Sequence, residues 1–370
     1  MFSDKYSLVT ILDTISETSM PLNEFVLYRL KKYPNIKQYV IVCDREENTN
    51  MQLPDELSIY YVEKNNKVMK RIMKKIVSEN YEKNSKLIVH LHQIKSALMF
   101  YRVMIGVKKT YKVLFTVHSV YALRNVKYKI SSVLCSLMAD KIICVSESSY
   151  KTYSSVVKKI KNKKILYIKN GVDIDRIDES IEEVKSTKNN KNYRTLVYVG
   201  RLIPIKNQKF LVNILSEISE CKLILVGAED NSKEISNLIK NLKLEDRVKI
   251  TGLIPRNQVF QILNDADIYV STSMVEGLPV SVLEAMAAKL PVILSDIEPH
   301  KEVAMNSSSV KLVSLNNESN WIDTINFYLN LDMDNLKEIG FECRKCVVEN
   351  FSLYKMHCNY DKEYETLISG

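Results

Sequence analysis

The sequence predicts an α/β protein of two doubly wound domains, each with a parallel sheet, facing a central cleft. Short apolar runs bounded by turn residues alternate with longer helical patterns, which is typical of βαβ units. The length of 370 residues exceeds that of a single ordinary hydrophobic core and favours two domains. Ligands of such sheets bind beyond the carboxyl ends of the strands, so functional residues are expected there.

We expect residues 1–180 to form the first domain. Six apolar runs in it predict strands, at 6–12, 38–43, 86–92, 112–118, 141–146 and 165–170. Helical patterns lie between these runs, among them 24–32, 68–77, 96–105 and 127–138.

Residues 193–350 are expected to form the second domain, and the polar stretch 181–192 the linker. Five apolar runs predict its strands, at 195–200, 222–227, 247–252, 267–272 and 291–296. Helical patterns again separate the runs, so the second domain repeats the βαβ organisation of the first.

Composition excludes several classes of protein. No apolar run reaches the roughly 18–20 residues of a membrane span, and the N-terminus lacks a signal-peptide pattern, so a cytoplasmic location is expected. The seven cysteines are scattered, and only Cys343 and Cys346 have CxxC spacing. Because no second pair completes a zinc site, we expect reduced thiols and no metal.

Positive charge is concentrated in the first half of the chain. The net charge is +9, yet residues 1–175 carry 30 Lys and Arg against 16 Asp and Glu. Nucleic acid, an anionic membrane or a phosphate-bearing substrate could each explain this surplus. The segment 64–83 is helical, amphipathic and cationic, so it favours either a membrane surface or an ordinary surface helix packed on its own sheet.

The segment 271–296 carries the chemistry that is easiest to interpret. Its pattern is a strand, a loop with Glu276, and a helix that opens at Pro279 and contains Glu284. The amides of Gly277, Leu278 and the first helical turn can face an anion. The carboxylates can accept hydrogen bonds from sugar and ribose hydroxyls, so the segment suits a nucleotide sugar. The alternative is that each carboxylate is merely solvated.

A second segment, 199–215, supplies cations. Gly200 ends a predicted strand, Arg201 follows it, and Lys206 lies where the next helix is expected to begin. A diphosphate requires cations that do not readily lose their charge, and an Arg with a Lys provides them. The alternative is a pair of solvated basic residues.

With these elements the chain resembles the family-4 glycosyltransferases, retaining enzymes of the GT-B fold. The resemblance rests on the spacing of Gly200, Arg201 and Lys206 and on the spacing of Glu276 and Glu284. The segment KNGVDIDRI and the strands that end at Gly227 and Gly252 follow in the family's order. Together these motifs cover about 130 residues of the C-terminal half. The N-terminal half matches in architecture and only patchily in motif.

The resemblance implies roles for single residues. Arg201 and Lys206 would hold the donor diphosphate, Glu276 would contact the donor sugar, and Glu284 would bind the ribose. The base would lie near the strand ends at Gly227 and Ile250. His118 ends a predicted strand, and its counterpart in many members contacts the donor sugar near the reacting centre; the alternative is a structural histidine. The expected catalytic residues are Glu276, His118, Arg201 and Lys206.

Other expectations concern metals and the acceptor. His90 and His92 share one face of a strand, but no third ligand is evident, and Asp265-Ala266-Asp267 is interpreted as structural because it joins a helix to a buried strand. The family needs no metal or other cofactor. The first βα loop, 16–25, lacks the family's glycine pair, and Asn23 and Glu24 are candidate acceptor contacts. The C-terminal helix, 351–370, is expected to pack back on the first domain.

The predicted activity is transfer of a sugar, with retention, from a UDP- or GDP-sugar to a glycan or lipid-linked acceptor. The usual setting is bacterial surface polysaccharide or lipopolysaccharide synthesis, in the cytoplasm or peripherally on the inner face of the cell membrane. A dinucleotide-dependent oxidoreductase would need GxGxxG after an early strand, and the first strand leads into a loop without glycine. A nucleic-acid-binding protein or membrane scaffold is the non-enzymatic alternative. No RNA- or DNA-binding motif is visible, so no nucleic-acid partner is expected.

Overall fold

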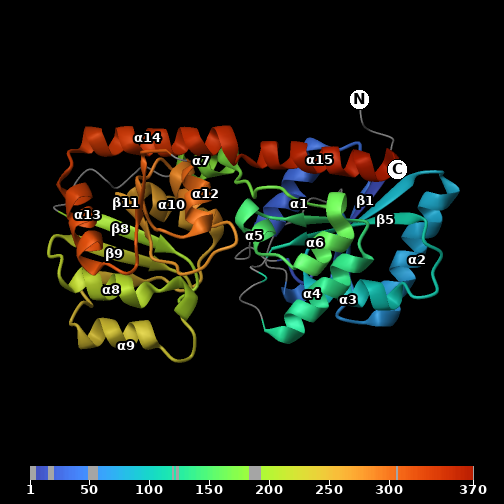
Figure 1. The fold of residues 1–370 in the computed structure, drawn as a ribbon, viewed down its shortest axis with the longest axis horizontal. Coiled ribbons are helices and arrows are strands. Elements are labelled where there is room, and N and C mark those ends of the chain that lie inside the picture. Colours follow the sequence, from blue (N-terminus) through green and yellow to red (C-terminus); the bar gives the residue numbers. More distant parts are fainter. Residues whose placement is uncertain are drawn as a thin grey trace. The chain divides into compact units, whose positions relative to one another are not determined.

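The computed structural model describes residues 6–15, 21–48, 57–118, 121, 125–182, 193–305 and 307–369. The chain forms two compact units (Figure 1). The first unit comprises Met1–Lys169 and Met356–Gly370, and the second comprises Asn170–Lys355.

The first unit is built on a parallel sheet in the order β3-β2-β1-β4-β5-β6-β7. In the described residues its strands are β1 (Tyr6–Leu12), β2 (Gln38–Val42), β3 (Ser58–Tyr61), β4 (Lys86–Leu91), β5 (Tyr111–Val117), β6 (Lys141–Cys144) and β7 (Ile165–Tyr167). The order of the first six strands is that of a Rossmann fold, and it reverses between β1 and β4. Burial explains the apolar runs of the sequence, since every residue of β1 is buried.

Helices cover both faces of this sheet, as expected for a parallel sheet with buried strands. They are α1 (Pro21–Lys32), α2 (Asn66–Glu82), α3 (Ile94–Val103), α4 (Val126–Met138), α5 (Glu147–Lys151) and α6 (Ser155–Lys161), with 3-10 turns at Glu46–Asn48 and Asn162–Lys164.

Helix α2 settles the alternative left open for the basic segment 64–83. Met69, Met73, Ile76 and Val77 are buried in the core of the first unit. The apolar stripe of α2 therefore packs on its own sheet, as in an ordinary surface helix, and is not available to a membrane.

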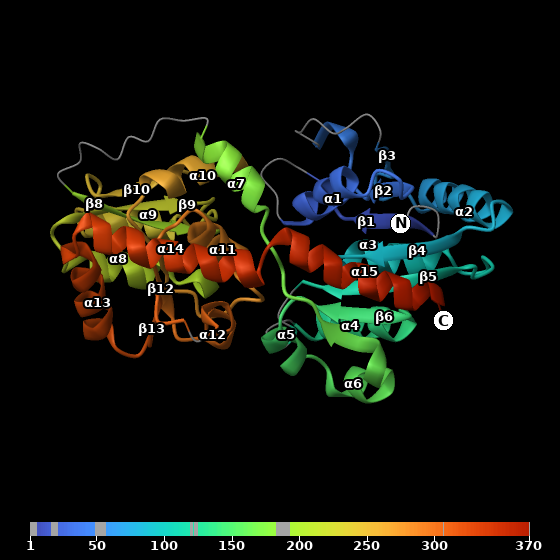
Figure 2. The same ribbon diagram turned by 90° about the horizontal axis from the view of Figure 1, so that it is seen from above.

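The C-terminal helix α15 (Leu353–Ser369) belongs to the first unit from Met356 onward (Figure 2). Tyr364 Oη lies 2.7 Å from Nδ1 of His90 at the end of β4. Arg29 of α1, 1% exposed, donates to Asp361 across 2.7 Å. These polar contacts join the last helix to β4 and α1.

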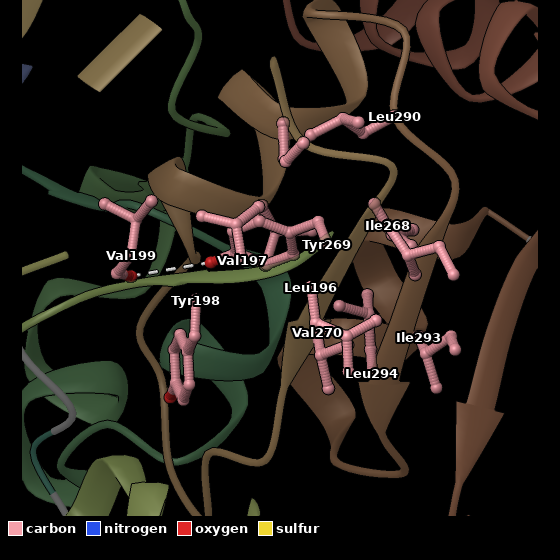
Figure 3. Packing of buried hydrophobic residues seen from close by; sticks show 14 of the residues in the cluster. Leu196, Val197, Tyr198, Val199, Ile268, Tyr269, Val270, Leu290, Ile293 and Leu294 are labelled. Carbon is pink, nitrogen blue, oxygen red and sulfur yellow. Dashed lines mark hydrogen bonds between the residues drawn. The ribbon is translucent and has the colours of Figure 1, made fainter. Parts of the chain in front are cut away.

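The second unit repeats the Rossmann order, as β10-β9-β8-β11-β12-β13, with all strands parallel. Its described strands are β8 (Arg194–Val199), β9 (Cys221–Val226), β10 (Val248–Ile250), β11 (Ile268–Ser271), β12 (Val292–Ser295) and β13 (Val310–Val313). Figure 3 shows buried residues of β8, β11 and β12 side by side in its core.

The described helices of the second unit are α7 (Ile174–Glu182), α8 (Gln208–Ser216), α9 (Glu234–Asn241), α10 (Arg256–Asp265), α11 (Val280–Ala287), α12 (Glu298–Ala304), α13 (Glu318–Asn330) and α14 (Met333–Asn350), with a 3-10 turn at Pro204–Lys206. Helix α14 approaches the end of α11 closely. A side chain on Gly340 would collide with the carbonyl of Lys289, so only glycine allows this approach.

The division between the units lies earlier than the predicted boundary at residue 180. It falls between Lys169 and Asn170, because α7 packs within the second unit. Ile177 is buried in the second core, and Arg344 of α14 donates to Asp178 of α7 across 2.6 Å. The chain returns to the first unit after Lys355 rather than after residue 350. Residues 183–192 of the expected linker lie outside the described residues.

Two strands were not expected from the sequence. Strand β3 is half-buried along its whole length, and only the two ends of β13 are buried, so neither is a continuous apolar run. Both lie at an edge of their sheet.

Candidate active site

The centre of the second sheet brings two loops together. Strands β8 and β11 are neighbours at the point where the strand order reverses, and ligands of such sheets bind there, beyond the carboxyl ends. Gly200 and Arg201 directly follow β8, and the segment 272–279 follows β11. The fold thus brings the segments 199–215 and 271–296 together at the carboxyl ends of β8 and β11.

Lys206 and Glu276 form an ion pair at this place. Lys206 Nζ lies 2.5 Å from Glu276 Oε1, and the two side chains are 18% and 10% exposed. Lys206 ends the 3-10 turn at Pro204–Lys206, one residue away from α8. The structure therefore joins a cation from one predicted segment to a carboxylate from the other.

The hydroxyls of two neighbouring residues, Ser273 and Tyr198, contact this pair. Ser273 Oγ donates to Glu276 Oε1 across 2.7 Å. The hydroxyl of Tyr198 lies 2.6 Å from Ser273 Oγ and 2.8 Å from the carbonyl oxygen of Lys206. Burial, together with the nearby Glu276 carboxylate, raises the pKa of Tyr198 well above its usual range. Tyr198 therefore stays neutral and contacts the backbone of Lys206 and the serine that donates to Glu276.

His300 and Ser295 extend the network. Ser295 Oγ donates to the carbonyl of Ser273 across 2.5 Å. Nδ1 of His300 lies 2.8 Å from the carbonyl oxygen of Ser295, and a carbonyl only accepts, so Nδ1 carries the proton. Burial lowers the pKa of His300 to about 4. Sequence reasoning missed Tyr198, Ser273, Ser295 and His300, because nothing in a buried strand or short loop distinguishes a network hydroxyl from a core residue.

Two glycines allow the loops after β8 and β9 to touch. Gly227 has a φ of +149°, and a side chain on it would collide with the carbonyl of Gly200. Leu202 N donates to the carbonyl of Ala228 across 2.8 Å, and Gly227 forms a bridge with Gly252 after β10. Ile250, at the end of β10, is half-buried beside them. The backbones at the three strand ends therefore approach one another closely at Gly227.

Arg201 lies apart from the ion pair. Its side chain is exposed, and its carbonyl accepts from the Gln208 side chain across 3.0 Å. The guanidinium is therefore presented to solvent beside the strand ends. The charge needed for a diphosphate is available there, although the structure does not bring Arg201 into contact with Lys206.

Glu284 is placed differently from Glu276. It is fully buried on α11, and its carboxylate pairs with the guanidinium of Arg256 on α10. The structure thus gives Glu284 a protein partner that the sequence did not suggest. Helix α11 begins at Val280, with Pro279 as its N-cap, one residue later than expected, because the ψ of Pro279 is extended at 91°. Leu278 is buried in the core, and Gly277 is half-buried in the preceding loop.

His118 follows β5 in the first unit and faces a second histidine. His118 Nε2 lies 3.1 Å from Nδ1 of His92, which follows the neighbouring strand β4. Burial lowers the pKa of His118 to about 4, and burial together with the positive charge of nearby histidines lowers that of His92 well below its usual value. Both rings are neutral near pH 7, and one ring nitrogen donates to the other.

His90 has structural partners. Its Nδ1 lies 2.7 Å from Tyr364 Oη, and its Nε2 lies 2.8 Å from Thr116 Oγ1. Both ring nitrogens are thereby occupied. Among the described residues, no group of three or more His, Cys, Asp or Glu is placed to hold a metal ion.

The candidate acceptor residues are both buried. Asn23 and Glu24, at 4% and 6% exposure, lie in the first turns of α1. Phe25 beside them packs against the ring of His92, with centroids 5.1 Å apart. The preceding loop residues 16–20 lie outside the described part of the chain. Asp267 accepts from the Thr195 amide across 2.7 Å, in line with a structural role for Asp265-Ala266-Asp267.

Two family models match this chain. Residues 60–176 match the model described as Glycosyltransferase Family 4, and residues 178–342 match the model described as Glycosyl transferases group 1. The chain belongs to glycosyltransferase family 4. The models span both units, so the first unit is shown to share the family as well as the motif-rich second one.

Two curated relatives illustrate this membership. The UDP-Gal:alpha-D-GlcNAc-diphosphoundecaprenol alpha-1,3-galactosyltransferase of Escherichia coli is 25% identical over 345 residues, 85% of each chain. An uncharacterized glycosyltransferase of Methanocaldococcus jannaschii is 31% identical over 165 residues, which are 43% of this chain and 40% of that protein.

Solved structures establish the fold. Anabaena HepE in complex with UDP and glucose has a TM-score of 0.77 at 15% identity, with 98% of this chain and 100% of that chain covered. This glycosyltransferase thus has the GT-B fold that its sequence predicted. Across the described residues, none of its helices has both the length and the apolar character of a membrane span.

Proposed function

We propose that this glycosyltransferase transfers a sugar from a UDP- or GDP-sugar to a glycan or lipid-linked acceptor, with retention of configuration at the transferred carbon. The observation that carries the proposal is the Lys206–Glu276 pair at the point where the strand order of the second sheet reverses. A cation and a carboxylate held 2.5 Å apart at a nucleotide-binding position suit a ligand with a diphosphate and a polyol.

The proposed roles are those that the family resemblance implies, and they agree with the chemistry of each side chain. Lys206 would exchange its contact with Glu276 for one with the donor diphosphate, and the exposed Arg201 would bind the same group from solvent. Glu276, held by Ser273, would accept hydrogen bonds from donor sugar hydroxyls. The strand ends at Gly227 and Ile250 offer backbone to the base, and Glu284 is the proposed ribose ligand.

The reaction breaks the bond between the anomeric carbon and the donor phosphate and forms one to the acceptor oxygen. The leaving diphosphate takes the bonding electrons, and Arg201 and Lys206 would stabilise its charge. The acceptor hydroxyl attacks from the face that the diphosphate leaves, and its proton passes to an oxygen of the leaving diphosphate. His118 is proposed to contact the donor sugar as a neutral ring, because burial lowers its pKa to about 4. No metal or other cofactor is part of the proposal.

A lipid-linked acceptor is supported by the E. coli relative, whose name specifies a diphosphoundecaprenol substrate. We place this glycosyltransferase in bacterial surface polysaccharide synthesis, in the cytoplasm and peripheral to the inner face of the cell membrane. Asn23 and Glu24 are proposed to help define the acceptor site.

Thermal unfolding in the presence of nucleotides tests the donor assignment, because a ligand that binds only the folded state raises its stability by mass action. UDP or GDP is expected to raise the unfolding temperature, and AMP is the control. Arg201→Ala and Glu276→Ala should abolish sugar transfer, and Arg201→Ala should also weaken the nucleotide shift. No shift with any nucleoside diphosphate, or full turnover in either variant, contradicts the proposal. The anomeric configuration of the product, read by NMR, tests retention.

A further inference from the structure

Helix α4 of the first unit exposes a row of large apolar side chains to solvent and buries serines. Val126, Ile130, Leu134 and Met138 are 71%, 55%, 50% and 51% exposed. A spacing of four residues places them along one side of the helix, over about 18 Å. A surface helix normally turns such a stripe toward the core, so this one lacks a protein partner within the described chain.

The inner side of α4 is small and polar, which explains its orientation. Ser132 and Ser136 are fully buried, and their hydroxyls lie 2.6 Å and 2.7 Å from Tyr153 Oη. Tyr153 precedes α6 and is itself buried. These hydrogen bonds fix the serines inward and thereby fix the apolar stripe outward.

The neighbouring helix α6 repeats the pattern. It lies beside α4 (Figures 1 and 2), and Lys161 Nζ donates to the carbonyl of Ala139 at the end of α4 across 2.6 Å. Val156 and Ile160 of α6 are 56% and 61% exposed. Two adjacent helices thus present isolated apolar side chains to solvent.

The charged residues of α4 and α6 themselves are all lysines, and the adjacent Asp140 pairs with Lys109. Residues 126–138 and 155–164 contain no Asp or Glu, and their lysines are Lys127, Lys129, Lys158, Lys159, Lys161, Lys163 and Lys164. Lys127, Lys159, Lys163 and Lys164 are exposed. Apolar side chains surrounded by lysines are the composition that binds anionic lipid headgroups and acyl chains together.

We propose that the α4–α6 surface, defined by Val126, Ile130, Leu134, Met138, Val156, Ile160 and the lysines of both helices, docks onto an anionic phospholipid bilayer. The charge favours lipid over a second copy of the chain, because two copies of this surface would repel one another. The proposal deepens the peripheral location proposed above and names the surface responsible, which is not α2.

Binding to vesicles tests the proposal without donor or acceptor. The full chain is sedimented with vesicles of equal parts phosphatidylglycerol and phosphatidylcholine, and with phosphatidylcholine alone. Binding is expected only to the first kind and should weaken as salt is added. Ile130→Ser/Leu134→Ser should reduce the partition coefficient by about tenfold per side chain. Lys159→Gln/Lys163→Gln/Lys164→Gln should reduce it by about fivefold per lysine.

Matched variants distinguish binding through the α4–α6 surface from nonspecific binding through any exposed apolar or basic residue. Phe327→Ser/Phe341→Ser removes side chains that are 60% and 56% exposed in the second unit. Lys67→Gln/Lys74→Gln/Lys75→Gln removes the same net charge from exposed positions of α2. Both controls should bind vesicles nearly as the unaltered chain does, and all variants should keep its unfolding temperature and nucleotide shift.

Three results would overturn the proposal. One is equal binding to both kinds of vesicle or to neither, and another is an equal loss of binding in the α2 control. The third is a concentration-dependent dimer that Ile130→Ser/Leu134→Ser disrupts, which would assign the surface to a second copy. Because the nucleotide shift is measured on the same samples, a failure here is distinguishable from a failure of the proposed transferase activity.

Discussion

Lys206 and Glu276 are separated by 70 residues of sequence, and their charged atoms lie 2.5 Å apart. Each is the counter-ion of the other in the structure, so neither of these two partly buried charges is left unpaired. A diphosphate would replace the carboxylate as the partner of Lys206 and leave Glu276 to accept from sugar hydroxyls. Under the proposed function, the pair would link donor binding to the orientation of the Glu276 carboxylate.

Replacing Lys206 by Met should remove a charge that matters most when the diphosphate leaves. We expect kcat for sugar transfer to fall by about 10²–10³-fold. The nucleotide-dependent thermal shift should shrink as well, because the ground state also uses the cation. Steady-state kinetics with a soluble acceptor measures the first effect.

Lys209→Met is the matched control for that variant. Lys209 pairs with Glu234 across 2.8 Å, and both side chains are more than half exposed, so the loss should cost little. Activity within about twofold of the unaltered enzyme is expected for Lys209→Met. An equal loss of activity in both variants would show that Lys206 acts only through the general charge of the unit.

Tyr198→Phe should separate support of the site from support of the core. The change removes a hydroxyl that lies within hydrogen-bond distance of Ser273 and of the Lys206 carbonyl. We expect the free energy of unfolding to fall by about 1–2 kcal/mol and kcat to fall by roughly tenfold. Tyr269→Phe loses a buried hydroxyl that hydrogen-bonds to Ser281 across 3.0 Å and to the Val199 carbonyl rather than to Ser273 or Lys206. It should show a similar loss of stability with full activity; a matching loss of activity would argue against a positioning role for Tyr198.

The sequence predicted the buried strands well, for a physical reason. Parallel strands covered on both faces are continuous apolar runs, as β1 is, and the predicted strand ends agree to within two residues except at β7, which ends at Tyr167 rather than at 170. Edge strand β3 is half-buried, so its sequence lacks that signal. The domain boundary was placed late because the polar stretch after α7 was more visible than the single buried Ile177 that ties α7 to the second core.

The candidate site was predictable only where a motif spaces charged residues. Lys206 and Glu276 were found in this way, whereas Tyr198 and His300 lie in segments without a distinctive composition. The partner of Glu284 was missed because Arg256 comes from a different helix, and only the tertiary fold brings its guanidinium to the carboxylate. The orientation of α4 was equally hidden, since hydrogen bonds to Tyr153 turn its serines inward against the usual pattern.

Acid should destabilise this protein through its histidines. Burial lowers the pKa of all five, to about 4 for His118 and His300. The unfolded chain then binds more protons than the folded one at any pH between about 4 and 6.5. Their contribution to the free energy of unfolding is complete above pH 6.5 and is lost as pH falls toward 4. Each histidine adds a slope of up to about 1.4 kcal/mol per pH unit.

His357→Phe isolates one of these contributions. The ring of His357 stacks on Phe25 and Tyr28, with centroids 4.5 Å and 5.0 Å apart, and no described residue hydrogen-bonds to either of its nitrogens. Phenylalanine keeps the stacking and cannot take up a proton. Urea unfolding should show the variant to be more stable than the unaltered chain at pH 5, with a smaller difference between pH 5 and pH 8. An unchanged pH dependence would mean that His357 titrates normally in the folded state.

Breaking the buried pair of Arg256 and Glu284 should lower the free energy of unfolding, because it leaves a buried charge without its counter-ion. Glu284 is 1% exposed at its side chain and Arg256 is 17% exposed. Arg256→Met leaves the carboxylate buried without its cation, and we expect a loss of about 3–5 kcal/mol in the free energy of unfolding. Arg256→Met/Glu284→Gln removes both charges and should recover most of that loss. If Glu284 also binds ribose, the double variant will be stable and yet show a reduced nucleotide shift. A stable double variant with an undiminished shift would restrict Glu284 to a structural role, because only the ribose contact distinguishes the two cases.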